Sequence, residues 1–253
     1  MLVMNNELSK GILMKKTILT LSTIILLVLA FGAYSFSHIV RSAFIDFLDF
    51  NKIDGNIYLS ETLPEQANQK ITQLIENART RITEYYGKPE AQPIIIVIGT
   101  EQEAKNYRLY DTPGTLYFTP WQNYLVLSYK NMNIDVISHE LVHAEIVHRL
   151  GYFTRQQEIP TWFDEGAALQ VDLRPNYTKI TQISQDEFQR VITLDSPDKF
   201  WSSDKAQNIK NYQSSKVVVT QFFQEHPSLS LYAMLQMIND GKTFKQIINE
   251  EKS

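Results

Sequence analysis

Two histidines four positions apart, with a glutamate between them, are the residues in this chain best suited to chemistry. His139-Glu140-Leu141-Val142-His143 is an H-E-x-x-H sequence. Residues four apart share one face of a helix, so His139 and His143 can present two imidazoles to one metal ion. Glu140 follows the first histidine directly, where its carboxylate can take a proton from a water on the metal. Zinc favours nitrogen ligands in a tetrahedral set, so the spacing predicts a zinc site with a third ligand elsewhere.

The third ligand is predicted downstream, in residues 159–168. This segment begins with a helix-start signal, because Pro160 lies near its first turn. Glu165 lies about a turn and a half into the expected helix, with small residues at 166–168 behind it. Small residues let two helices approach closely enough to share one ion. Glu165 therefore completes a predicted site for one zinc ion per chain.

The helix that carries the histidines has clear start and stop signals. Asn133 or Asp135 can cap its first turn, and Gly151 can end it. Apolar residues recur between these ends at helical spacing. We expect Glu145 and His148 to lie on the exposed surface of this helix.

These residues resemble the gluzincin metallopeptidases. His139-Glu140-x-x-His143 followed by Trp162-Phe163-Asp164-Glu165-Gly166-Ala167-Ala168 looks most like their membrane-associated, peptidase MA-like branch. The likeness covers roughly residues 93–247 and is strongest over 138–170. It implies that His139, His143 and Glu165 bind zinc and that Glu140 is the general base. The alternative, an amphipathic helix whose histidines make surface contacts, explains neither glutamate.

The resemblance implies two further roles. Related aminopeptidases donate a hydrogen bond to the developing oxyanion from a Tyr on a later helix, and Tyr212 occupies a similar place. Ser214 and Ser215 stand where Lys and Gly occur in those enzymes, so a packing role for Tyr212 stays open. Asp164 stands where related enzymes often have Asn, and it can accept a hydrogen bond from an imidazole. The exopeptidase signatures of that group are missing, so aminopeptidase specificity is not indicated.

Two predicted strands precede the metal helix, at 114–118 and 124–127. In gluzincins a sheet edge beside the active-site helix pairs with extended substrate backbone. Either segment could supply that edge, and either could instead belong to a hairpin that only covers the core.

The whole pattern predicts an α+β fold of zincin type, with a small twisted sheet packed on a bundle of helices. Residues 152–159 are expected to be a polar connection. Strands are predicted at 57–59, 93–98, 115–119 and 124–128, and helices at 64–86, 101–107, 186–190, 208–225, 228–239 and 244–249.

Composition restricts the possible functions. The 253 residues are 43% hydrophobic and 21% charged, which is ordinary globular usage. Cysteine is absent from the sequence, which excludes disulfides and thiolate metal sites. The formal net charge is −4 and basic residues form no run with aromatic ones, so no nucleic-acid partner is predicted. The expected partner is a peptide or protein substrate.

The N-terminal region predicts attachment to a membrane. Residues 17–40 contain no Asp, Glu, Lys or Arg, and about 20 apolar residues suffice to span a bilayer. Lys15 and Lys16 precede this run, and Asp46 and Asp49 follow it. The positive-inside rule then places the N-terminus in the cytoplasm and the following domain on the extracytoplasmic side. A cleaved signal peptide and secretion are the alternative, because residues 33–35 form a small-x-small cleavage site.

The predicted organisation has four parts: a cytoplasmic N-terminus at 1–16, a transmembrane anchor or signal peptide at 17–37, a juxtamembrane linker at 38–55, and a zincin-like metallopeptidase domain at 56–253.

The predicted function is that of a membrane-anchored zinc metallopeptidase with Glu140 as general base. A non-catalytic, membrane-tethered binding or assembly module with a zinc site is the main alternative. A hydrolase acting on a non-peptide bond is a third.

Overall fold

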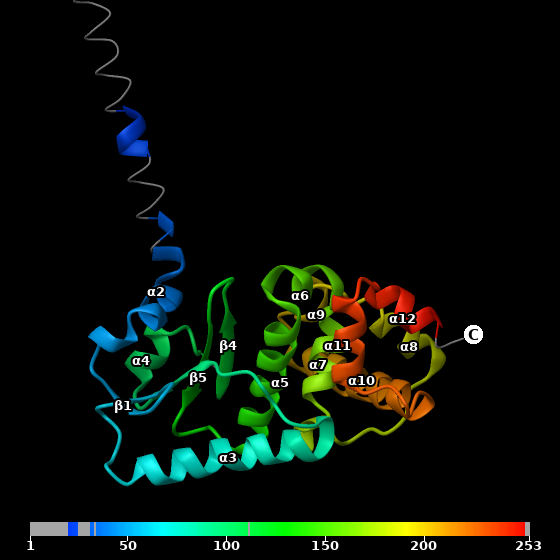
Figure 1. Cartoon of the computed structure of the whole chain (residues 1–253), viewed down its shortest axis with the longest axis horizontal. Helices are drawn as coiled ribbons and strands as arrows, with labels where there is room; N and C mark the ends of the chain where they lie inside the picture. Colours follow the sequence, from blue (N-terminus) through cyan, green and yellow to red (C-terminus); the bar gives the residue numbers. More distant parts are fainter. Residues whose placement is uncertain (1–19, 25–30, 33, 111, 251–253) are drawn as a thin grey trace, which may run out of the picture.

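The chain has an α+β fold with a five-stranded mixed sheet and a separate helical part (Figure 1). A computed structural model describes residues 20–24, 31–32, 34–110 and 112–250. The strands lie in the order β1-β2-β3-β5-β4. Their bounds are Phe50–Asp54 for β1, Ile57–Ser60 for β2, Ile94–Ile98 for β3, Gly114–Phe118 for β4 and Asn123–Ser128 for β5.

The centre of the sheet is parallel and its two edges are antiparallel. Strand β3 pairs in parallel with both β2 and β5, whereas β1 and β4 are antiparallel to their neighbours. The nearly unbroken apolar run in β3 suits a central strand that is covered on both faces. Strand β4 pairs with β5 from Gly114 opposite Leu127 to Phe118 opposite Asn123. Among the described residues β1 and β4 are the two edge strands of the sheet, so β4 and not β5 is the edge strand beside α5.

Helices cover both faces of the sheet. Strand alternation sends Ile95 and Val97 into the main core with α3 (Ala67–Tyr86) and α5 (Ile134–Leu150). Ile96 and Ile98 point the other way, into a second cluster with η1 (Ile45–Phe47) and α4 (Glu101–Asn106). Figure 1 shows α3 running along the side of the sheet opposite the N-terminal segment.

The helical part extends the main core beyond α5. Helices α7 and α10 make its most extensive contact, and α7 also packs against α5. These elements are α6 (Tyr152–Glu158), α7 (Thr161–Ala168), η2 (Pro175–Tyr177), α8 (Gln185–Val191), α9 (Pro197–Phe200), α10 (Lys205–Glu225), α11 (Leu231–Asn239) and α12 (Phe244–Glu250).

The segment 152–159 forms helix α6, so the expectation of a polar connection was wrong. Gly151 ends α5 with φ of +77°, and the next helix starts immediately. The ring of Tyr152 lies 6.1 Å from that of Phe118 at the end of β4. Helix α6 therefore depends on packing over the edge strand, which its polar composition did not indicate.

Glu145 is buried, which also corrects the expectation from sequence. It is 1% exposed, and one of its carboxylate oxygens accepts hydrogen bonds from the backbone N–H groups of Glu90 and Ala91. Arg149, one helical turn later, pairs with the other oxygen at 3.1 Å. Burial of a carboxylate is tolerated when its oxygens are satisfied in this way. Glu145 thus joins α5 to the chain that leads into β3.

Residues 38–55, expected to be a linker, contribute to the fold. They contain most of α2 (Ser37–Ala43), all of η1 and the edge strand β1. Ile45 is buried in the second core cluster, and the Tyr58 hydroxyl donates to Asp46 at 2.6 Å. The expected membrane segment at 17–37 lies partly outside the described residues, at 17–19, 25–30 and 33. Within the described part of the chain, no helix is long and apolar enough to cross a membrane.

Gly166 lets α7 and α10 approach closely. A Cβ added at this position would lie 2.6 Å from the backbone oxygen of Ser215 and 2.5 Å from a methyl of Val219. A backbone oxygen cannot move aside as a flexible side chain can, so the contact requires glycine. The small residues behind Glu165 thus serve the contact with α10.

We expect Gly166→Ala to lower the free energy of unfolding of the metal-free protein by about 1–3 kcal/mol through overpacking. The intrinsic helix preference for Ala over Gly, about 1 kcal/mol, acts in the opposite direction, so a net loss would show that the clash dominates. Urea denaturation measures the change. Gly55→Ala is the control, because open space surrounds Gly55; equal stability of Gly166→Ala and wild type would contradict the close contact.

Candidate metal centre

Helix α5, which carries His139 and His143, is well defined at both ends. The Asn133 side chain accepts from the backbone N–H of Val136 at 3.0 Å, which satisfies a donor in the first turn. At the other end the N–H of Gly151 donates to the Val147 carbonyl at 2.8 Å. Asn133, rather than Asp135, is therefore the cap. The rigid helix between these ends holds His139 and His143 one turn apart.

The structure brings His139, His143 and Glu165 together in a buried triad. The Nε2 atoms of the two histidines are 3.1 Å apart. Oε2 of Glu165 lies 3.3 Å from Nε2 of His139 and 3.6 Å from Nε2 of His143. With zinc–ligand bonds of about 2.0–2.1 Å, two ligands of a tetrahedral site lie about 3.3 Å apart. The three donor atoms thus have the mutual spacing of three corners of a zinc tetrahedron.

The donor set also fits a cation chemically. Oε2 of Glu165 is buried and accepts no hydrogen bond, although an unpaired buried carboxylate oxygen is costly. The two Nε2 atoms face each other at 3.1 Å, so without a metal one ring has to carry a proton on Nε2 and donate it to the other. A divalent ion between the three atoms would satisfy all of them. Two imidazoles and one carboxylate leave a fourth tetrahedral position open, as in catalytic zinc sites.

His143 is oriented by Asp164, as its position before Glu165 predicted. Oδ1 of Asp164 lies 3.0 Å from Nδ1 of His143, so the imidazole can donate there and keep Nε2 free for a metal. Arg155 of α6 pairs with the other oxygen of Asp164. The role of α6 in the site was not visible in the sequence.

Asp172 lies at ion-pair distance from His139, without a hydrogen bond to its Nδ1, and sequence reasoning missed it. Its Oδ2 lies 3.3 Å from Nδ1 of His139, and it is fully buried. The Arg174 guanidinium holds both oxygens of Asp172 at 2.9 Å through its Nε. Asp172 follows α7 in a loop, and nothing in its spacing connects it with α5. Only the Asp-x-Arg pair could have drawn attention to it.

The charges in the site suit a cation. Burial opposes ionisation of Glu165, but the neighbouring histidines outweigh it and lower the pKa of Glu165 to about 2. The pKa values of Asp164 and Asp172 are lowered as well, because their arginine and histidine partners outweigh burial. Three carboxylates are therefore ionised at neutral pH around two imidazoles. Metal binding has to displace protons only from the histidines, whose pKa values these carboxylates raise against burial.

Glu140 lies beside the triad and contacts the edge strand. Its Oε2 accepts a hydrogen bond from the backbone N–H of Leu116 at 2.8 Å. Strand β4 reaches α5 because Gly114 has no side chain: a Cβ there would lie 2.9 Å from a methyl of Val136. The edge strand, the glutamate and the metal ligands thus form one continuous site.

Tyr212 lines the same cavity as His139 and Glu140. This cavity has a volume of about 90 Å³, and Arg174 and Tyr177 also line it. The Tyr212 hydroxyl accepts from the Trp201 indole N–H at 2.9 Å, which leaves its own proton available for donation. Burial, followed by the Glu165 charge, raises the pKa of Tyr212 well above its ordinary value. Tyr212 therefore lies at the same cavity as His139 and Glu140, with its hydroxyl proton free to be donated.

No protein-family description, curated protein or solved structure matches the chain.

We expect the wild-type protein to bind about one zinc ion per chain, because three convergent ligands leave one tetrahedral position for water. His143→Ala should lose the metal. Elemental analysis after gel filtration measures both. A fully occupied His143→Ala site would remove His143 from the ligand set.

We expect Asp172→Asn to weaken zinc binding about 10–100-fold, because the amide cannot stabilise the oriented, basic imidazole of His139 as a carboxylate does. Competition with a chromophoric chelator measures the dissociation constant. Asp195→Asn is the matched control, since Asp195 is exposed and pairs only with Lys199. Equal affinities for the two variants would show that Asp172 does not support the metal ligand.

Proposed function

We propose that this protein is a zinc-dependent metallopeptidase that hydrolyses peptide bonds. The observation that carries the proposal is the buried His139/His143/Glu165 triad with Glu140 between it and a free strand edge. An open tetrahedral position, an adjacent carboxylate and an edge strand are three parts that suit metal-assisted hydrolysis of a peptide bond. The triad alone is equally compatible with other zinc hydrolases, and the strand edge is what favours a peptide substrate.

The residues of the chain divide the work of the reaction. Zinc, when bound, supplies a Lewis acid that polarises the scissile carbonyl and lowers the pKa of the attacking water. Glu140 takes the proton from that water and passes it to the departing amine. Asp164 hydrogen-bonds Nδ1 of His143 and so directs its Nε2 at the ion, and Asp172 lies 3.3 Å from Nδ1 of His139 as its ion-pair partner. The hydrogen bond from Leu116 holds the Glu140 carboxylate towards the cavity.

The free edge of β4 supports binding of extended polypeptide. An edge strand presents unpaired N–H and C=O groups, which an extended peptide can pair with as an added strand. Strand β4 is antiparallel to β5 on one side and ends the strand order on the other. Because this pairing uses only backbone groups, it would bring a peptide bond of the substrate beside Glu140 whatever the side chains of the substrate are.

Tyr212 is the proposed donor to the oxyanion that develops during attack. Its hydroxyl is protonated at neutral pH, and burial raises its pKa further above the ordinary value of a tyrosine. An oriented donor of this kind acts mainly in the transition state.

We further propose that the uncharged run at 17–40 attaches the protein to a membrane, with the domain on the extracytoplasmic side. The run leads directly into α2, which packs against the domain: the ring centroids of His38 and Tyr117 are 4.6 Å apart. The lysines before the run and the aspartates after it support this orientation.

We expect Glu140→Gln to retain zinc but to lose nearly all hydrolytic turnover, because the amide keeps the shape of the side chain and cannot accept the proton. A digest of a diverse peptide library, with zinc content measured on the same samples, tests this. Glu76→Gln, on the exposed face of α3, is the control. Near-normal turnover by zinc-loaded Glu140→Gln would exclude Glu140 as the base. If the wild type cleaves no peptide or protein, a non-catalytic zinc-binding module becomes the better interpretation.

We expect Tyr212→Phe to lower kcat about 10²-fold or more while zinc content stays the same, as for loss of one oxyanion donor. Stability should change little, because the half-exposed Trp201 indole can donate to water instead. If Tyr212 only packs, the Phe variant should keep its activity, and Tyr212→Ala should lose about 3 kcal/mol or more of stability. Tyr177→Phe is the matched variant in the same cavity; loss of turnover there alone would transfer the role to Tyr177.

A further inference from the structure

Large aromatic side chains are exposed along one side of the domain. Phe36, Phe44, Phe47, Trp121 and Phe153 are each between 58% and 83% exposed. They come from three places: α2 and the following η1, the turn between β4 and β5, and α6. We call these five residues the aromatic rim. Single exposed apolar residues are common, but a contiguous set indicates a binding surface.

The three segments that carry the rim contact one another. Helix α2 touches β4 through His38 and Tyr117, whose ring centroids are 4.6 Å apart. The end of β4 touches α6, because Phe118 lies 6.1 Å from Tyr152 and 4.4 Å below the Arg155 guanidinium. The rim therefore belongs to one rigid ridge formed by α2, the β4–β5 turn and α6.

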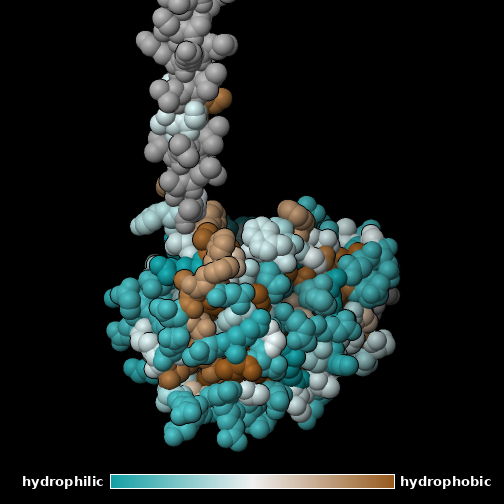
Figure 2. Space-filling view, turned by 60° about the vertical axis from the view of Figure 1, so that its left-hand side comes forward, coloured by the Kyte–Doolittle hydropathy of each residue, from teal (hydrophilic) through white to brown (hydrophobic). Residues whose placement is uncertain are grey.

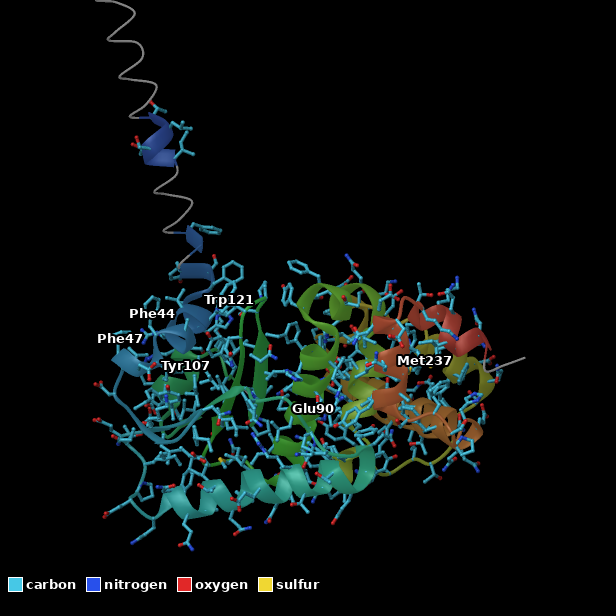
Figure 3. The ribbon with its side chains drawn as sticks, viewed as in Figure 1. Phe44, Phe47, Glu90, Tyr107, Trp121 and Met237 are labelled. Atoms are coloured by element: carbon cyan, nitrogen blue, oxygen red, sulfur yellow. The ribbon has the colours of Figure 1, made fainter. Side chains whose placement is uncertain are left out.

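The ridge lies on the side of the domain from which the N-terminal segment leaves. In Figure 1, α2, the upper end of β4 and α6 form the upper boundary of the domain, and α3 forms the lower one. Figure 3 shows Phe44, Phe47 and Trp121 along this upper side, below the N-terminal segment. Figure 2, turned about the vertical axis, shows hydrophobic residues gathered directly beneath that segment.

We propose that the aromatic rim rests on the surface of a lipid bilayer. Tryptophan and phenylalanine favour the interface between headgroups and acyl chains, where a large apolar ring can be partly buried in lipid. The occupant is a bilayer because the uncharged run at 17–40 continues directly into α2. The packing of α2 on β4 then holds the rim close to the point where the chain leaves the membrane. The proposal rests on the proposed membrane attachment and adds a second, independent contact to it.

The absence of cysteine from the sequence allows a direct test. Full-length Trp121→Cys and Phe153→Cys proteins, each carrying one nitroxide label, are reconstituted into vesicles of phosphatidylcholine and phosphatidylglycerol. Glu76→Cys, on the exposed face of α3 at the opposite side of the domain, is the matched control. Power-saturation EPR compares collisions with lipid-soluble oxygen and with a water-soluble nickel chelate. Vesicle flotation of the same samples reports attachment through the N-terminal run.

We expect labels at 121 and 153 to collide several-fold more with oxygen relative to the nickel chelate than the label at 76. If all three labels are equally accessible to the nickel chelate while the protein floats with the vesicles, the rim proposal is wrong and the membrane attachment stands. If the protein does not float, both are wrong. Dipolar broadening between labels at 121 that disappears on dilution with unlabelled protein would identify the rim as an interface between two copies and would also overturn the proposal. Zinc content and turnover are independent of these readouts, so the peptidase proposal is tested separately.

Discussion

The mutual approach of two imidazole nitrogens and one carboxylate oxygen is the constraint on which the rest of the structure depends. His139, His143 and Glu165 bring these atoms within 3.6 Å of one another in a buried place, and without a cation the arrangement leaves one oxygen unpaired. Such an arrangement is costly unless a positive charge joins the donors. It requires α5 and α7 to be held at a fixed separation, and the surrounding elements supply that restraint.

Behind each histidine lie first a carboxylate and then an arginine. Each histidine has a buried carboxylate on Nδ1, Asp164 or Asp172, and each of these carboxylates has an arginine partner, Arg155 or Arg174. The arginines come from elements outside the ligand helices, so α6 and the loop after α7 are tied to the metal centre. The arginines are only partly buried, so they neutralise the carboxylates from the solvent side. The two histidines and Glu165 remain enclosed.

The sequence predicted the parts of this site that are set by local spacing. His139, Glu140 and His143 lie within two turns of one helix, and Asp164 is adjacent to Glu165, so helical periodicity alone relates them. Asp172 and Arg174 could not be predicted in this way, because they reach His139 from a loop through tertiary packing. For the same reason the sequence left open which strand forms the sheet edge, and the strand order now selects β4, whose Leu116 N–H donates to Glu140. Glu145 was misjudged because its polarity indicated exposure, whereas backbone donors satisfy its carboxylate in a buried place. Helix α6 was missed because its polar composition indicated a connection and gave no sign of the contact between Tyr152 and Phe118.

Strand β4 connects the two proposals physically. At Leu116 its backbone contacts Glu140, and at its end Phe118 packs against α6, just before the turn that exposes Trp121. Successive strand residues rise about 3.3 Å, so Leu116 and Trp121 are separated by at most about 17 Å along the chain. If the rim rests on a bilayer, a peptide paired with the free edge of β4 lies within about that distance of lipid. If both proposals hold, the substrates best suited to this geometry are extended polypeptide segments that emerge from the same membrane. A freely diffusing peptide gains nothing from the rim, whereas a membrane-anchored substrate is confined with the enzyme to one surface, which raises its effective concentration at the edge strand.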